Sequence, residues 1–211
     1  MSTIHALAEQ RVVLNDVTWE TYLALATETD RPGKRIAYDQ GVMEIMSPGI
    51  LHENAGRLIG RMVEVFTEEL NIEAAAVKST TFRRSDKKRG FEADESFYIA
   101  NESAIRGKHH IDLSIDPPPD LVIEIDISRT SMNKFAIYGG LEVPEVWIYD
   151  GQSLIVYLHA KGPNYDMANQ SAALQRFPLT EAVRCLDRRH QLSQTELIRG
   201  FRGYVRRQMQ G

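Results

Sequence analysis

The sequence contains a single cysteine, Cys185, which excludes a disulfide within the chain and a zinc site built on cysteines. It also lacks an apolar run long enough to cross a membrane, which takes about 18 residues. No leader in which a charged start precedes an apolar centre opens the chain. We therefore expect a protein of the reducing cytoplasm with no membrane partner.

A strong excess of charge of one sign is also missing, since the net charge is −4. This excludes a surface that is basic throughout, although it allows a local basic face for nucleic acid. The 211 residues suffice for one substantial core, and no internal repeat is visible. We expect a weakly specified segment over 1–17, one domain over 18–180, and an extension over 181–211 whose helix packs on that domain.

Hydrophobic periodicity predicts an alternation of helices and strands. Apolar residues at helical spacing predict helices over 19–28, 51–70, 131–141 and 193–208. Short apolar runs bounded by turn residues predict strands over 35–38, 42–46, 72–77, 91–99, 120–127, 145–149, 153–159 and 174–178. The expected fold class is therefore α/β.

The most informative stretch is 117–138, which begins with three prolines and continues as a strand. Side chains of a strand alternate between its two faces. One face is then apolar, and the other carries Asp120, Val122, Glu124 and Asp126. A half-buried strand with a wet outer face would show the same alternation. Because no cation interrupts this acidic face and like charges repel, we favour a strand that binds a divalent cation.

A second acidic strand and a lysine complete the pattern. Glu92 and Asp94 share one face of the strand predicted over 91–99. Lys134 lies in the first turn of a helix for which Ser128, Thr130 and Ser131 are candidate N-caps. A cation is disfavoured at that end of a helix. An acidic cluster nearby would explain its position.

These residues together predict a hydrolytic metal centre. Asp94 and Glu124, on adjacent strands, could converge on one Mg²⁺ or Mn²⁺, ions that prefer carboxylate oxygens. Such an ion polarises a phosphoryl oxygen and lowers the pKa of bound water. Lys134 could orient or activate that water, or neutralise charge that develops on the phosphate. Phosphodiester hydrolysis needs this combination.

Two further segments have both a plain and a functional interpretation. His52 and Glu53 lie in the first turn of the helix over 51–70, where Glu53 could simply complement the helix dipole and His52 could be an exposed polar residue. The run over 78–89 is strongly basic, which is typical of a solvated loop or of a contact with a phosphate backbone. Its candidate nucleic-acid-binding residues are Arg83, Arg84, Lys87, Lys88 and Arg89.

Several runs, taken in order, carry a resemblance to a known family. They are Leu51-His52-Glu53, then 90–99 around Asp94, then Pro119-Asp120-Leu121-Val122-Ile123-Glu124-Ile125, then Lys134 with Ile137-Tyr138, and last Val143-Pro144-Glu145-Val146-Trp147. This sequence resembles the Uma2 family, a group of endonuclease-like proteins in the restriction-endonuclease-like PD-(D/E)XK superfamily. The resemblance extends over residues 18–180 and is most specific over 117–150.

The resemblance implies a restriction-endonuclease-like core, a mixed sheet flanked by helices. It makes Asp94 and Glu124 the metal ligands and Lys134 the superfamily lysine, displaced onto the following helix. His52 ranks above Glu53 as the helix residue, while Glu92, Asp120 and Asp126 could support the site. The sequence departs from the superfamily pattern at Asp126, which stands where the Glu-X-Lys motif has its lysine, and at Ala93, where the first motif has proline.

The function predicted from these features is metal-dependent cleavage of DNA. Two other classes stay open: a nucleic-acid-binding protein that keeps the fold but does not cut, and a domain for protein interaction. A homodimer is expected by analogy, because many relatives of this fold pair to cut two strands.

Overall fold

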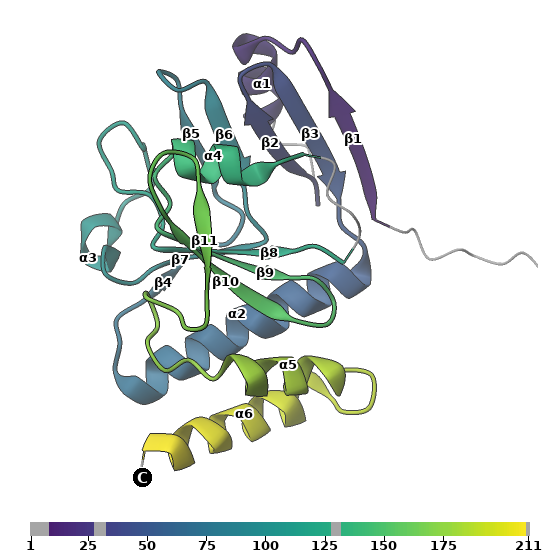
Figure 1. Ribbon diagram of the computed structural model, residues 1–211, viewed down its shortest axis with the longest axis vertical. Helices are drawn as coiled ribbons and strands as arrows, with labels where there is room; N and C mark the ends of the chain where they lie inside the picture. Colours follow the sequence, from purple (N-terminus) through teal and green to yellow (C-terminus); the bar gives the residue numbers. More distant parts are fainter. Residues whose placement is uncertain (1–8, 28–32, 128–131, 210–211) are drawn as a thin grey trace, which may run out of the picture.

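The computed structural model describes residues 9–27, 33–127 and 132–209, which form two sheets with helices around them (Figure 1). The first sheet has the strand order β1-β3-β2-β6-β5 and is antiparallel in every pair. Its strands are β1 (Gln10–Leu14), β2 (Arg35–Asp39), β3 (Val42–Ser47), β5 (Thr81–Arg84) and β6 (Arg89–Glu92).

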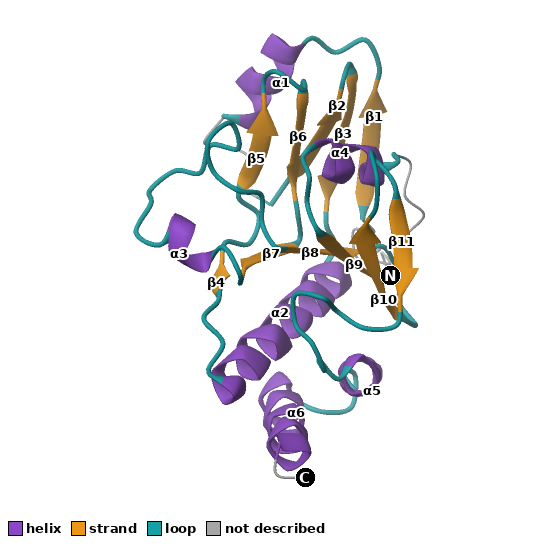
Figure 2. Ribbon diagram, turned by 60° about the vertical axis from the view of Figure 1, so that its left-hand side comes forward, coloured by secondary structure: helices purple, strands orange, loops and turns teal. Residues whose placement is uncertain are grey.

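The second sheet has the order β11-β10-β9-β8-β7-β4 and is mixed, because β8 and β9 run parallel while its other described pairs are antiparallel. Its strands are β4 (Ala75–Ala76), β7 (Glu95–Tyr98), β8 (Leu121–Ile125), β9 (Glu145–Tyr149), β10 (Leu154–His159) and β11 (Tyr165–Ala168). The expected mixed sheet with flanking helices is thus confirmed, with a second sheet beside it (Figure 2).

Strand β8 is buried on both faces, since all five of its residues are inaccessible to solvent. Leu121, Ile123 and Ile125 join the core beneath helix α2 (Ile50–Leu70), whereas Val122 joins the core beneath helix α4 (Lys134–Gly140). Period-two alternation places Glu124 on the same side as Val122. The strand therefore has no wet outer face, and Glu124 is buried on the α4 side.

The remaining helices pack on a sheet or on other helices, or connect strands. Helix α1 (Trp19–Ala26) packs on the first sheet through Trp19 and Tyr22, and the Thr18 side chain caps it as expected. Helices α5 (Leu179–Asp187) and α6 (Gln194–Met209) lie against α2 (Figure 1), and the short α3 (Glu102–Ile105) lies between β7 and β8 in the chain. None of the helices in the described part of the chain is both long and apolar enough to cross a membrane.

The C-terminal arginines belong partly to this packing. Arg202 and Arg206 of α6 donate to the Glu69 carboxylate of α2, with Nη1–Oε1 and Nε–Oε2 distances of 2.5 and 2.7 Å. Their guanidinium groups hold the pKa of Glu69 down to about 2. These side chains link two helices and do not form a purely solvated face.

Two strand predictions were wrong, and three strands were not predicted. The segment predicted as one strand over 91–99 bends at Ala93–Asp94, so that β6 ends in the first sheet and β7 starts in the second. The segment over 174–178 forms no strand, and α5 follows it. Strands β1, β5 and β11 lie in stretches that the sequence pattern left as loop or weakly specified chain. The N-cap candidates Ser128, Thr130 and Ser131 lie outside the described residues.

Candidate active site

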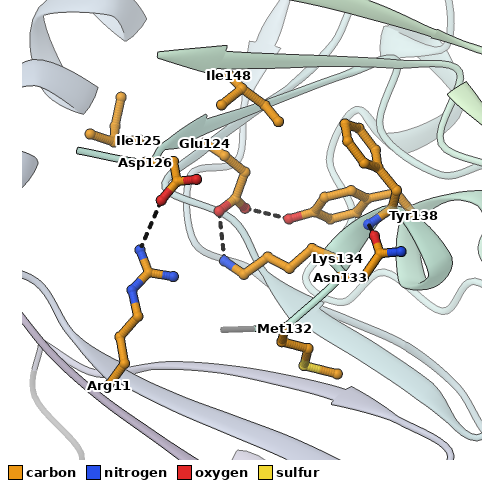
Figure 3. Close-up of a pocket in the computed structure, with 10 residues that line it drawn as sticks. Arg11, Glu124, Ile125, Asp126, Met132, Asn133, Lys134, Tyr138 and Ile148 are labelled. Carbon is orange, nitrogen blue, oxygen red and sulfur yellow. Dashed lines mark hydrogen bonds and ion pairs between the residues drawn. The ribbon is translucent and has the colours of Figure 1, made fainter. Parts of the chain in front are cut away.

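Glu124 is held at both carboxylate oxygens by helix α4. Lys134 Nζ donates to Oε2 at 2.6 Å, and the Tyr138 hydroxyl donates to Oε1 at 2.5 Å. Lys134 and Tyr138 are four residues apart, so they lie one above the other on the same face of the helix. Figure 3 shows both side chains pointing from α4 toward the carboxylate on β8. The acidic neighbourhood expected for Lys134 is therefore present.

Asp94 lies beside Glu124, at the bend where the chain passes from the first sheet to the second. Its Oδ2 accepts a hydrogen bond of 2.8 Å from the Ile125 amide, the residue that follows Glu124. Its Oδ1 lies 2.8 Å from His52 Nε2 and 3.9 Å from Arg35 Nε. The two strand acids predicted to converge are thus adjacent, joined by the backbone of β8.

His52 is buried between two acids, whose carboxylates favour its protonated form. It lies at the start of α2, with Nδ1 at 2.7 Å from Glu9 Oε2 and Nε2 at 2.8 Å from Asp94 Oδ1. Burial alone would lower the pKa of His52, but the carboxylates of Asp94 and Glu9 outweigh this and raise it. An imidazolium has a proton on each nitrogen and no lone pair for a metal. His52 in this arrangement neutralises and orients Asp94.

Helix α2 approaches the site closely through a glycine. A Cβ added at Gly56 would lie 3.4 Å from the Ile125 side chain and 3.8 Å from the Asp94 Cβ. Gly56 is one helical turn after His52, so both residues lie on the face of α2 that meets the strands. The small residue therefore lets His52 come within contact distance of Asp94.

The electrostatics of the cluster follow from burial and opposite charge. Burial raises the pKa of Glu124, and the charge of Asp94 adds to this, while Lys134 opposes it. Burial would raise the pKa of Asp94 too, but His52 and Lys134 outweigh it and lower the value. Burial would lower the pKa of Lys134, but Glu124 and Asp94 raise it above its ordinary value. Lys134 is therefore a fixed cation at neutral pH.

Residues in and beside the first sheet close the other side of the site. They are not predicted as site residues from the sequence. Arg11 of β1 donates to Glu9 Oε1 at 2.5 Å and to Glu44 Oε1 at 3.3 Å, and its Nη2 lies 3.9 Å from Asp126 Oδ1. Glu44 is 1% exposed on β3. A lone carboxylate within the apolar run over 42–46 was the available signal, whereas nothing local marks Glu9 or Arg11.

A pocket of about 350 Å³ opens beside Glu124 and Lys134 (Figure 3). Arg11, Asp126 and Asn133 are among the other polar residues that line it. Apolar side chains make up much of the rest of its wall, namely Ile125, Met132, Phe135 and Ile148.

Two of the candidate supporting acids lie elsewhere and hold the fold together. Asp120 accepts three hydrogen bonds, from the amides of Ile99 and Asn101 at 2.6 and 2.9 Å and from Asn101 Nδ2 at 2.6 Å. Glu92 accepts from the Ile36 amide at 3.0 Å and from Thr81 Oγ1 at 2.6 Å. Both carboxylates are committed to joining strands and loops. Glu53 is half-exposed at the margin of the site, 3.2 Å from Arg35 Nη2.

The basic residues over 83–89 are not brought into the pocket. Arg84 pairs with Asp86 and Arg89 with Asp39, with shortest N–O distances of 2.6 and 2.7 Å. Lys87 and Lys88 lie on the β5–β6 turn and line a separate hollow near the start of α1. The strand β6 separates this turn from Asp94. Arg83, on β5, is half-buried.

The donor set fits a hard divalent cation that keeps several waters. Among residues 9–27, 33–127 and 132–209, no three His, Cys, Asp or Glu side chains are grouped so as to enclose a metal. Mg²⁺ is commonly held by one or two carboxylates and completes its shell with water and substrate oxygens. Asp94 Oδ1 accepts no well-aligned hydrogen bond, although His52 Nε2 lies 2.8 Å from it, and each Glu124 oxygen keeps a second lone pair. Asp94 and Glu124 thus suit a metal site that leaves positions free for water and substrate, and not a site in which side chains fill every position.

Comparison with known proteins adds a family. Residues 19–206 match the Uma2 family, described as "putative restriction endonuclease". The chain is also similar to a crystal structure described as "a putative nuclease belonging to DUF820" from Anabaena variabilis. The two share 17% identity over 88% of this chain and 99% of that chain, with a TM-score of 0.48. No curated protein matches this sequence significantly.

Proposed function

The chain belongs to the Uma2 family, and from this premise we propose that it is a metal-dependent nuclease that hydrolyses phosphodiester bonds of DNA. Asp94 and Glu124 would hold Mg²⁺ or Mn²⁺, and Lys134 would act beside them. The cytoplasmic location and the homodimer stay predictions from the sequence.

One observation carries the proposal: Asp94, Glu124 and Lys134 meet although they come from a bend, a strand and a helix. The Lys134–Glu124 distance is 2.6 Å, and the Asp94 carboxylate is hydrogen-bonded to the very next residue of β8. Burying three charged groups together costs free energy unless they are paired and hydrogen-bonded. A buried acidic cluster beside an open pocket is an arrangement typical of catalytic sites.

The residues divide the work of hydrolysis between them. A bound Mg²⁺ or Mn²⁺ would neutralise phosphate charge and make a water nucleophilic at neutral pH. Lys134 donates one of its three N–H groups to Glu124, so the other two are available to orient a water or to stabilise charge on the phosphate. Because its pKa is raised, Lys134 acts as a cation and not as the base. His52 keeps Asp94 ionised, and Tyr138 fixes the rotamer of Glu124.

The test is a cleavage assay on plasmid and single-stranded DNA with Mg²⁺, with Mn²⁺ and with chelator. We expect cleavage that depends on the metal and falls by at least about 100-fold in Glu124→Gln and Lys134→Ala. Lys161→Ala, which removes an exposed lysine, is the matched control and should cut like the wild type.

The rival classes give different results in the same assay. Salt-dependent DNA binding without cleavage by the wild type would favour a binding protein that keeps the fold. Neither binding nor cleavage would favour a protein-interaction domain. Equal cleavage by wild type, Glu124→Gln and Lys134→Ala would exclude this site as the catalytic one.

The β5–β6 turn makes a separate contribution to the proposal. Arg84 and Arg89 form ion pairs with Asp86 and Asp39, whereas Lys87 and Lys88 on the turn form none among the described residues, so these two lysines are well placed to meet a DNA backbone. Changing both to Ala should reduce the slope of binding against salt by about one to two contacts. An unchanged slope of binding against salt would mean that the turn is ordinary solvated surface and does not contact DNA.

A further inference from the structure

The pocket beside Glu124 is too apolar to be explained by phosphate binding alone. Ile125, Met132, Phe135 and Ile148 line it together with Glu124 and Lys134. Figure 3 shows the Glu124 carboxylate and the Lys134 amine facing each other there. Both of its cations are already compensated, Lys134 by Glu124 and Arg11 by Glu9 and Glu44. A phosphate beside Lys134 would leave the apolar wall of the pocket uncovered, whereas a flat apolar group would gain from burial against that wall.

Phe135 extends the apolar wall into an aromatic cluster. Its ring centroid lies 4.9 Å from that of Tyr157 on β10 and 5.0 Å from that of Tyr165 on β11. The Tyr165 hydroxyl donates to the Val143 carbonyl at 2.6 Å, which fixes that ring in place. All three rings are half-buried, so the cluster is a rigid support for Phe135 at the pocket wall.

A nucleobase is the part of a nucleic acid that matches this wall. Bases stack on aromatic side chains, and each stacked base contributes about 1–3 kcal/mol to binding. In a duplex every internal base is already stacked and paired, so reaching a recessed pocket requires unpairing or flipping, which costs a few kcal/mol. A single strand presents its bases without that cost. The volume, near the lower end of small-ligand sites, suits one nucleoside.

We propose that this pocket binds one unstacked base of a single-stranded DNA substrate next to the phosphodiester at Glu124, with Phe135 as the stacking residue. The inference rests on the proposed nuclease function, because it assigns the substrate class of the same site. It makes the enzyme selective for single strands or for single-stranded regions in duplexes.

The first experiment needs no variant of the protein. Cleavage rates are compared for one oligonucleotide as a single strand and for the same strand annealed to its complement. In a second series, an abasic residue replaces each nucleotide in turn around the mapped cut in the single strand. We expect the single strand to be cut at least about tenfold faster than the duplex. One abasic position should lower the rate by about 5-fold to 100-fold, the loss of one stacked base.

The second experiment measures binding by fluorescence anisotropy in the Glu124→Gln background. Phe135→Leu keeps an apolar side chain but removes the ring, and should weaken single-strand binding about tenfold without changing duplex binding. Tyr204→Leu on α6, far from the pocket in the fold, is the matched control and should bind like its parent.

The outcomes separate this inference from the function beneath it. Cleavage of duplex as fast as single strand, with no sensitive abasic position, overturns the base pocket and leaves the nuclease intact. Absence of cleavage of every substrate overturns the nuclease. In that case single-strand binding that is lost in Phe135→Leu still supports the pocket, and binding unaffected by Phe135→Leu, or none at all, overturns it.

Discussion

Asp94 and Glu95 are neighbours in the chain, and both are buried against helix α2, yet their surroundings are opposite. Asp94 meets His52 and lies near Gly56, and its pKa is lowered. Glu95 lies against Gly60, one helical turn further on, and its Oε2 has no hydrogen-bond partner among the described residues. Burial raises the pKa of Glu95 to about 7, and Lys78 and Arg57 oppose this only in part.

The comparison distinguishes two ways of burying a carboxylate. Asp94, with His52 in contact, stays ionised and is available to a metal or a substrate. Glu95, with which Lys78 and Arg57 form no ion pair among the described residues, takes up a proton near neutral pH and lies as a neutral side chain beside a glycine. Burial alone therefore does not identify a catalytic acid, and the charges that face it do.

The largest expected effect that tests this contrast is on activity. Asp94→Asn keeps the shape of the side chain and an oxygen for the Ile125 amide, but it removes the charge. We expect cleavage to fall by about 1,000-fold, or about 4 kcal/mol of transition-state stabilisation, measured as kcat/KM on a DNA substrate. Glu95→Gln is the matched control and should keep activity within about threefold. Equal losses in the two variants would abolish the distinction.

A somewhat smaller effect is expected on stability when the cation is removed. His52→Gln leaves Glu9 and Asp94 buried without the imidazolium, and should lower the free energy of unfolding by about 3 kcal/mol. Urea denaturation at neutral pH measures this, with the exposed His190→Gln as control. The double variant His52→Gln/Asp94→Asn should recover about 1 kcal/mol, because the uncompensated charge is gone. Additive losses would mean that the two side chains are not coupled.

The smallest expected effect concerns Glu95 and pH. Its pKa is about 7 in the folded protein against an ordinary value of 4.5, so the folded state binds a proton that the unfolded state releases between these values. The contribution of Glu95 to the stability of the fold is therefore fully present below pH 4.5 and is lost as the pH rises through 7. Glu95→Gln should remove this dependence and stabilise the protein at pH 8 by about 1–3 kcal/mol.

The measurement is chemical denaturation at a series of pH values, with the highly exposed Glu73→Gln as control. A variant that is less stable than the wild type at pH 8 would show that Glu95 is ionised and paired in the folded protein.

The sequence was sufficient for the centre of the site because its signals are local. The alternation along β8 marks Glu124, and the unfavourable position of Lys134 at a helix start marks its need for an acid. Family motifs connect these residues with Asp94. The hairpins, helix α2 and helix α4 are similarly local in origin, which explains why their predictions hold.

The rest depends on contacts between distant parts of the chain. The sequence makes Asp120 a possible supporting acid of the site, but Ile99 and Asn101, some twenty residues earlier, occupy its oxygens. Likewise, Arg11 acquires a role only because β1 pairs with β3, where Val13 lies opposite Glu44. The break at Asp94 was hidden because both flanks are buried, and a buried strand gives the same pattern whether it continues straight or changes sheet.

Among the described strands, β1 pairs only with β3 and so lies at an edge of the first sheet. Edge elements open at a lower free energy than central strands, and amide hydrogen exchange detects such opening. When β1 detaches, Arg11 leaves the wall of the pocket and the site loses a compensating cation. The hydrogen-exchange rates of the β1 amides therefore report how often β1 detaches and opens the pocket. A bound substrate that contacts the Arg11 wall would slow this exchange.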